Sequence, residues 1–233
     1  MRRAIRYVHS LILLFAVLFP IRLDAQEPPF SIKPFISIVS SAKIYTSPFS
    51  LDIEERNTTI DLDAFATYGA ALSWAFSGES RLEISAEYLE TAMSRYDNNK
   101  TEIRDGFRAA ALEICPQFIL PFSSRRFRLC IGGGAGIYIA VRRSSIAGIQ
   151  AKADRSHPSM GILVSFGAEY VLSRHLAVNG EVRYRDPQID TRNAFPQSNV
   201  LSNGILYPLE QRPFDARVNI DGTVYRLAIA YRF

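Results

Sequence analysis

The fold is decided by Val218-Asn219-Ile220-Asp221-Gly222-Thr223-Val224-Tyr225-Arg226-Leu227-Ala228-Ile229-Ala230-Tyr231-Arg232-Phe233. From Tyr225 to Phe233 every second residue is aromatic or aliphatic, whereas the residues between them are small or basic. A period of two indicates a strand with two different faces. Aromatic residues lie at both ends of the apolar face. This order is typical of a strand that crosses a bilayer, because aromatic side chains favour the two interfaces.

Seven further stretches show the same alternation, and in 127–142 it is especially clear. The predicted strands are 30–45, 62–76, 81–96, 106–122, 127–142, 159–172, 175–185 and 218–233. Long connections (46–61, 97–105, 143–157 and 186–217) alternate with short turns (77–80, 123–126 and 173–174). The sequence therefore predicts an all-β fold, a transmembrane antiparallel eight-stranded up-and-down β-barrel. The sheet must close, because an open edge in lipid leaves backbone groups without partners. Both termini are expected on the periplasmic side.

Residues 1–25 have the features of a secretory signal peptide, and residues 26–233 are predicted to form the barrel domain. Three arginines near the start precede a short apolar run over 11–19, and Ala25 offers a small residue for cleavage. Pro20 and Arg22 end the apolar run after about ten residues, whereas a spanning helix needs about 20. The signal segment also holds most of the net charge of +4, so the remaining chain is close to neutral. The sequence pI of 9.1 therefore gives no reason to expect nucleic acid as a partner.

The polar faces of the predicted strands carry nearly equal numbers of acidic and basic residues. Facing lipid, each charge would cost roughly 2–4 kcal/mol near the midplane, whereas inside the barrel acids and bases can pair. Since an eight-stranded barrel has an interior just filled by side chains, we expect a plugged interior with no continuous pore. The predicted interior charge network comprises Glu83, Glu87, Glu113, Glu169, Glu181, Arg128, Arg142, Arg183, Arg226 and Arg232.

The signal segment, the alternating strands, the order of loops and the terminal Tyr231-Arg232-Phe233 together resemble the OmpA/OmpX-type outer-membrane β-barrel family of Gram-negative bacteria. The resemblance covers nearly all of residues 30–233 and consists of patterns, so it is informative about fold and localisation more than about function. It implies localisation in the bacterial outer membrane. It also implies that Tyr231 and Phe233 form the signal for the barrel-assembly machinery, a partner during biogenesis.

Cys115 and Cys130 fall on the inward faces of two strands joined by one short turn. Directly opposed β-carbons lie within bridging distance, so a disulfide is allowed and the register decides whether it forms. Two cysteines alone are a poor metal site. The run Gly132-Gly133-Gly134-Ala135-Gly136 lies inside a strand, which favours tight interior packing over a phosphate-binding loop.

His157, Ser159 and Glu169 are the one set of residues that suggests an enzyme, because outer-membrane lipid A deacylases use a His/Ser/Glu set. Ser159 and Glu169 are ten residues apart on one strand, roughly 30 Å, so they cannot meet as catalysis requires. We therefore expect no enzyme, no catalytic residues, no metal site and no cofactor. The acidic residues of the first loop and the sequence Asn57-Thr58-Thr59 are expected to be ordinary solvated loop positions.

We expect an integral outer-membrane protein with a role in membrane integrity, whose partners are outer-membrane lipids and lipopolysaccharide. Three alternatives remain: binding or adhesion through the extracellular loops to an unknown ligand, a lipid-modifying enzyme, and a narrow porin.

Overall fold

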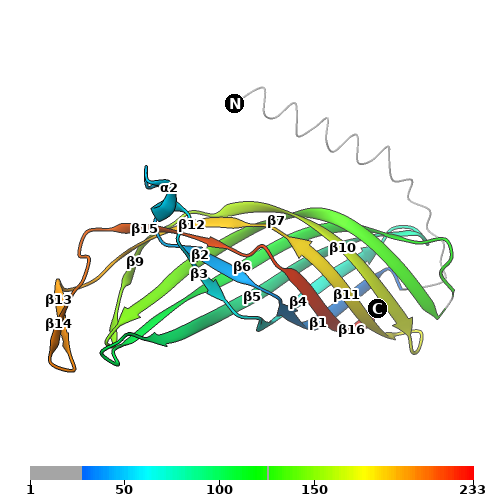
Figure 1. Ribbon diagram of the computed structural model, residues 1–233. Helices are drawn as coiled ribbons and strands as arrows, with labels where there is room; N and C mark the ends of the chain where they lie inside the picture. The colour runs from blue at the N-terminus through cyan, green and yellow to red at the C-terminus, as the bar shows by residue number, and fades with distance from the viewer. Residues whose placement is uncertain (1–27, 125) are drawn as a thin grey trace.

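The computed structural model describes residues 28–124 and 126–233, and within these ranges eight strands close into one antiparallel barrel. Each strand pairs with its neighbour in sequence, and β16 closes the cylinder against β1 (Figure 1). The predicted eight-stranded barrel is confirmed. The predicted signal peptide, residues 1–25, lies outside the described residues. The barrel strands are β1 (Phe30–Val39), β4 (Phe65–Ala75), β5 (Ser80–Tyr96), β6 (Glu102–Ile119), β7 (Phe127–Ile146), β10 (Ser159–Val171), β11 (Leu176–Arg185) and β16 (Thr223–Arg232).

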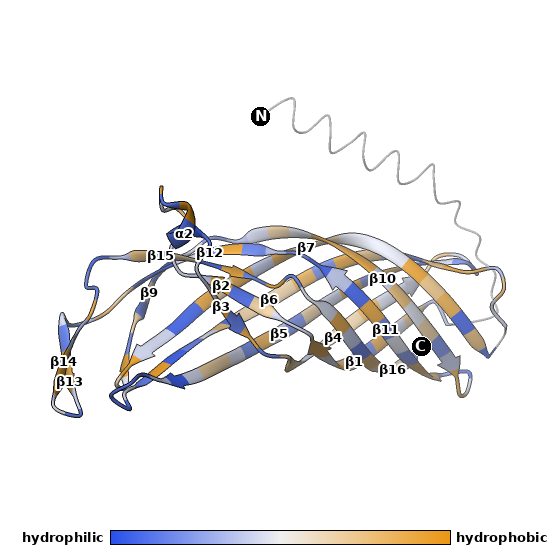
Figure 2. Cartoon of the chain, viewed as in Figure 1, coloured by the Kyte–Doolittle hydropathy of each residue, from blue (hydrophilic) through white to orange (hydrophobic). Residues whose placement is uncertain are grey.

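Over these strands the pattern of burial is the reverse of that in a water-soluble barrel. Ile36 is 63% exposed and Ile229 is 55% exposed, whereas Arg183 and Arg185 are fully buried. Hydrophobic and hydrophilic residues alternate along the strands in Figure 2. Apolar groups on the outside and charged groups on the inside are the arrangement of a barrel surrounded by lipid.

Aromatic side chains mark two levels of this apolar exterior. Phe233 and Trp74 stack against Phe30 at the end with the short turns. At the other level, Tyr68 and Tyr88 pack with their ring centroids 5.6 Å apart. The intervening residues are aliphatic, so the two levels correspond to the two interfaces of a bilayer. Among the described residues, no helix is long and apolar enough to cross a membrane.

A second sheet extends five of the eight barrel strands beyond the level of Tyr88. Its strand order, β3-β2-β15-β12-β9, matches the order β4-β1-β16-β11-β10 in the barrel. Each of its strands is therefore the continuation of the barrel strand next to it in sequence, after a break of two or three residues. The five strands are β2 (Ala42–Tyr45), β3 (Thr59–Leu62), β9 (Lys152–Ser156), β12 (Gln188–Ala194) and β15 (Phe214–Asn219).

Hydrogen bonds bridge the breaks between the two sheets. The Ser40 amide donates to the Thr223 carbonyl at 2.9 Å, and the Ile220 amide donates to the Pro187 carbonyl at 3.2 Å. Val39 and Ala42 are both buried although they are three residues apart, so the break shifts the alternation by one residue, as a β-bulge does. The prediction of uninterrupted strands over 30–45 and 218–233 is therefore wrong, because each of these strands bends at the break between the two sheets.

The long connection 186–217 is also more ordered than the sequence indicated. It contains β12, the hairpin strands β13 (Asn199–Ser202) and β14 (Ile205–Pro208), and most of β15. The four prolines that favoured an irregular loop lie between these strands or at their ends, where no ladder hydrogen bond from their nitrogen is needed. They delimit the strands and do not exclude them.

The remaining connections carry two small projections. The first contains the short helix α2 (Ile53–Arg56), which Asp52 caps by accepting a hydrogen bond from the Glu54 amide. The β13–β14 hairpin lies at the far end of the molecule from the short turns (Figure 1). A two-residue strand, β8 (Ile149–Gln150), turns back after β7 and pairs antiparallel with its end.

Candidate functional site

The barrel interior at the level of the lipid-facing belt holds a network of four acidic and four basic side chains. The acids come from β5, β6 and β11, and the bases come from β1, β11 and β16. Formal charges therefore cancel within the network, as burial of so many ions requires. The members are Glu83, Glu87, Glu113, Glu181, Lys33, Arg183, Arg185 and Arg226.

Arg183 lies at the centre of this network. Its guanidinium contacts Glu181 at 2.7 Å and Glu83 at 3.1 Å, and it also pairs with Glu113. Glu83 in turn accepts a hydrogen bond from Lys33 at 2.9 Å. One arginine thus connects opposite walls of the cylinder, because β11 and β5 are not neighbours in the sheet.

Arg185 and Arg226 extend the network to Glu87. Arg185 pairs with Glu87 at 2.7 Å and with Glu113 at 3.0 Å. Arg226 contacts Glu87 at 3.2 Å and lies 3.7 Å from the centre of the Phe35 ring, a cation–π geometry. Each carboxylate therefore has more than one cationic partner, which restricts the side chains of this level to one arrangement.

A second ionic cluster lies nearer the short turns and is centred on Glu169. Arg232 and Arg81 contact Glu169 at 2.7 and 3.0 Å, and Arg128 approaches it at 3.8 Å. Arg81 also donates to the Gln117 side chain at 2.6 Å. The cluster ties β5, β7, β10 and β16 together at the end of the barrel where both of the described chain ends lie.

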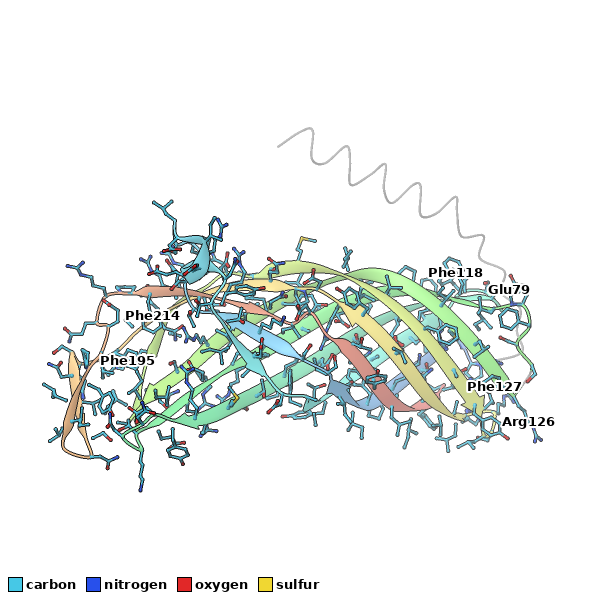
Figure 3. All side chains as sticks on the ribbon, in the orientation of Figure 1. Glu79, Phe118, Arg126, Phe127, Phe195 and Phe214 are labelled. Carbon is cyan, nitrogen blue, oxygen red and sulfur yellow. The ribbon has the colours of Figure 1, made fainter. Side chains whose placement is uncertain are left out.

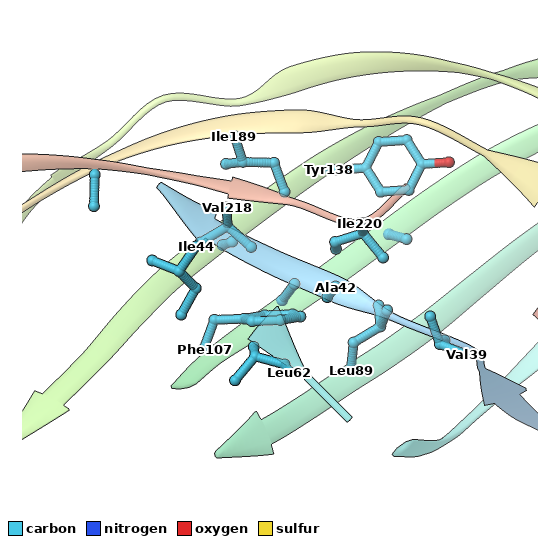
Figure 4. Packing of buried hydrophobic residues seen from close by; sticks show 14 of the residues in the cluster. Val39, Ala42, Ile44, Leu62, Leu89, Phe107, Tyr138, Ile189, Val218 and Ile220 are labelled. Atoms are coloured by element: carbon cyan, nitrogen blue, oxygen red, sulfur yellow. The ribbon is translucent and has the colours of Figure 1, made fainter. Parts of the chain in front are cut away.

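Above the ionic network the interior becomes apolar. Leu89, Phe107 and Tyr138 from the barrel strands face Ile44 and Val218 from the second sheet, and all are buried (Figure 4). The Tyr138 hydroxyl points back to the ions and donates to Glu113 at 2.7 Å. This apolar layer, defined by the cluster around Phe107, lies directly above the ions.

Arg142 is buried and ion-paired, as the sequence predicted for an interior charge, but it lies apart from the two clusters above. It pairs with Asp105 at 2.8 Å beyond the apolar layer, and its guanidinium lies 5.5 Å from the centre of the Phe214 ring. Figure 3 shows Phe214 and Phe195 at the end opposite to Phe118 and Phe127. Arg142 has the inward parity that the sequence indicated, but β7 is long enough to carry it past the lipid-facing belt.

Four further interior residues were not in the predicted network. Lys33 and Arg185 follow the inward parity of their strands, so alternation alone could have found them. Arg81 stands at the predicted start of its strand, where the face is hard to assign from sequence. Tyr138 was missed because an aromatic residue in a membrane strand is expected to face lipid.

Cys115 and Cys130 are buried and free, so the disulfide that the sequence allowed is not formed. The ladder places Cys130 opposite Ile119. Cys115 lies four residues before Ile119 on β6, so the two cysteines do not oppose each other. Cys130 instead accepts a hydrogen bond from Arg81 at 3.2 Å, and Cys115 lies 3.6 Å from the Ser165 hydroxyl.

The glycines of β7 allow close packing inside the barrel. A β-carbon at Gly134 would lie 1.9 Å from the Ile114 carbonyl oxygen, and one at Gly136 would lie 2.8 Å from the Glu113 side chain. The run lies inside a strand, and no phosphate-loop geometry is present around it.

The residues that suggested catalysis are kept apart. Ser159 pairs with Tyr138 near one end of β10, and Glu169 pairs with Arg128 near the other end. The Ser159 hydroxyl donates to the Met160 carbonyl at 3.4 Å. Among the described residues, no three His, Cys, Asp or Glu side chains are grouped so as to hold a metal ion.

The residues of the predicted assembly signal lie on the outside of the barrel. Tyr231 and Phe233 are 53% and 56% exposed and stack on each other, with ring centroids 6.4 Å apart. They belong to the aromatic level near the short turns, and their exposure is compatible with the predicted signal.

Comparisons with known proteins show the fold but no family. No family model matches the chain, and no curated protein matches it. Among solved structures, the outer membrane protein OprG from Pseudomonas aeruginosa superposes with a TM-score of 0.61 at 15% identity, over 89% of this chain and 97% of that one. Neisserial surface protein A gives 0.48 at 10% identity, over 88% and 97%. The N-terminal β-barrel domain of Pseudomonas aeruginosa OprF gives 0.44 at 8% identity, over 89% and 98%.

Proposed function

We propose that this protein is an integral β-barrel of the bacterial outer membrane that strengthens the membrane and contains no continuous large pore. The observation that carries this proposal is the filling of the interior by two successive layers. Arg183 and its carboxylates occupy the first layer, and Phe107 with its neighbours occupies the second. The short turns would face the periplasm and the second sheet the cell exterior, in keeping with the usual length of loops on the two sides.

Two measurements test this proposal. The purified full chain in planar bilayers should give no steady unitary current, whereas stable current steps would favour the narrow porin. Cells that lack the protein should become more sensitive to detergent with EDTA, and the wild-type chain should restore resistance. Equal resistance with and without the protein would remove the structural role.

A binding or adhesion role is the second candidate, because apolar side chains are exposed on both loop projections. Leu201 and Leu206 face each other across the β13–β14 hairpin and are 69% and 62% exposed. Leu51 before α2 is fully exposed. Such side chains cost free energy in water and are common where a partner binds. Deletion of 199–208 should abolish cell binding, and intact binding would eliminate this candidate.

We propose no catalytic role, since the separation of Ser159 from Glu169 leaves the serine without a carboxylate-oriented base. The lipid A mass profile should therefore be identical in cells with and without the protein. A mass shift that depends on Ser159 would overturn this part of the proposal.

A further inference from the structure

A cluster of exposed basic side chains lies on the outer face of the barrel, immediately above the level of Tyr88. Arg108 on β6 pairs with Glu90 on β5 at 3.1 Å, and Arg143 on β7 contacts the same carboxylate oxygen at 2.7 Å. Tyr88 donates to the second oxygen of Glu90 at 2.7 Å. Glu90 therefore holds two guanidinium groups side by side, and the three side chains come from three adjacent strands.

The cluster leaves most of its hydrogen-bonding capacity facing outward. Arg108 is 50% exposed and Arg143 is 38% exposed, and each has five N–H donors. Arg104 and Lys152 add two more exposed cations around Arg143. Glu90 and Glu102 are the acids of this surface, so the four cations exceed the acids by two charges.

Two hollows adjoin Arg143. One of about 260 Å³ lies toward Arg104, and a larger one of about 590 Å³ lies toward Arg108 and Lys152. Both are lined by Gln150 as well as by Arg143, so they meet at these residues. Each hollow thus has cationic donors on its edge and opens to the surroundings of the barrel.

The position of the cluster along the barrel identifies its ligand. Ile137 and Ile139, which precede Arg143 on the outward face of β7, are exposed apolar residues below the cluster and at the level of Tyr88, and the tyrosine pair lies at the interface. Arginine binds phosphate by paired N–H donors, and basic residues beside a bilayer bind anionic headgroups. We propose that this cluster is a binding site for a bisphosphorylated glycolipid of the outer leaflet, with one phosphate in each hollow. This inference rests on the proposed localisation and on the outward orientation of the long loops.

Lipid binding by the purified full chain in detergent tests the site. Native mass spectrometry with added bisphosphorylated lipid A should show a bound lipid. The double variant Arg108→Gln/Arg143→Gln should weaken binding roughly thirtyfold. The matched control Arg174→Gln/Arg212→Gln removes two exposed arginines elsewhere and should bind as the wild type does. Unchanged heat mobility in detergent gels would show that both variants are folded.

Other probes make the outcome decisive. Lipid A without phosphates should bind weakly and equally to the wild type and the double variant. Equal binding of bisphosphorylated lipid A by the wild type and the double variant would overturn the site. Equal, arginine-dependent binding of phosphatidylglycerol would overturn the choice of glycolipid. None of these results depends on bilayer conductance or detergent sensitivity, so the failure of this inference is distinguishable from failure of the proposed function.

Discussion

The two levels of the barrel interior have opposite chemistry although the same strands enclose both. Toward the loop end, the inward residues Glu83 and Glu87 of β5 give way to Leu89. In the same direction on β6, the inward Glu113 gives way to two alanines and then to Phe107. The outer face changes at the same level, from Ile84 and Leu112 to the charged cluster around Glu90. The interior is therefore ionic where the outer face is apolar, and an apolar layer follows where the outer face becomes charged. Apolar side chains face lipid in the first case and pack away from water in the second.

The ionic level should be the more sensitive to the loss of one side chain. Arg183→Leu leaves the carboxylates of Glu83 and Glu181 buried without their shared partner, which should lower the free energy of unfolding by roughly 3–5 kcal/mol. Urea unfolding of the protein folded into lipid vesicles measures this loss. Arg212→Leu, which removes an exposed arginine, is the control. A loss for Arg183→Leu no larger than that of the control would contradict the ionic account.

The apolar level should respond through cavity formation. Phe107→Ala removes a fully buried ring from the apolar layer and should cost about 3 kcal/mol in the same unfolding experiment. Phe49→Ala, at a largely exposed position, should change the free energy by less than about 0.5 kcal/mol. Similar values for the two variants would show that the second sheet does not pack on the barrel as described.

The close approach of β6 and β7 can be tested at a single methyl group. Gly134→Ala places a β-carbon against the Ile114 carbonyl oxygen and should destabilise the barrel by about 2 kcal/mol. Gly133→Ala meets only an ordinary contact at 3.6 Å and should cause no loss. If both variants unfold at the wild-type urea concentration, the interior at this level is less tightly packed than the glycines indicate.

The smallest effect is expected at the loop end, where the β13–β14 hairpin docks by hydrogen bonds. The Tyr207 hydroxyl donates to Asp97 at 2.6 Å, and this bond lowers the pKa of Asp97 below its ordinary value of about 3.8. A lowered pKa in the docked state stabilises docking above the ordinary value. This contribution is lost as the pH falls through the lower pKa. Proteolysis of 199–208 should therefore accelerate in strong acid, and Tyr207→Phe should remove that dependence.

The contrast between the two levels also explains what could be predicted from the sequence. Residues such as Ile229, Arg226 and Glu181 follow strict alternation, so the barrel and most of the ionic interior were accessible to pattern analysis. The lipid-facing belt forces that alternation, because a misplaced charge there is costly.

The apolar layer was not predictable in the same way. Ile44, Ile60 and Ile189 lie in segments that are short, interrupted and rich in polar residues, so their alternation is weak. Their burial depends on strands from distant parts of the chain meeting in the second sheet. The bend at Ser40 and Ser41 also shifts the parity of the alternation, which a single continuous strand assignment cannot represent.

The change of medium along the wall is tested most directly by a nitroxide scan of the outward positions of β7 in a bilayer. Labels at Ile131, Ile137 and Ser145 would be introduced into a chain in which Cys115 and Cys130 are replaced by alanine. Oxygen, which concentrates in lipid, should relax the first two labels, whereas a water-soluble nickel complex should relax the label at Ser145. Nickel access at Ile131 and Ile137 equal to that at Ser145 would contradict a lipid-facing belt around an ionic interior.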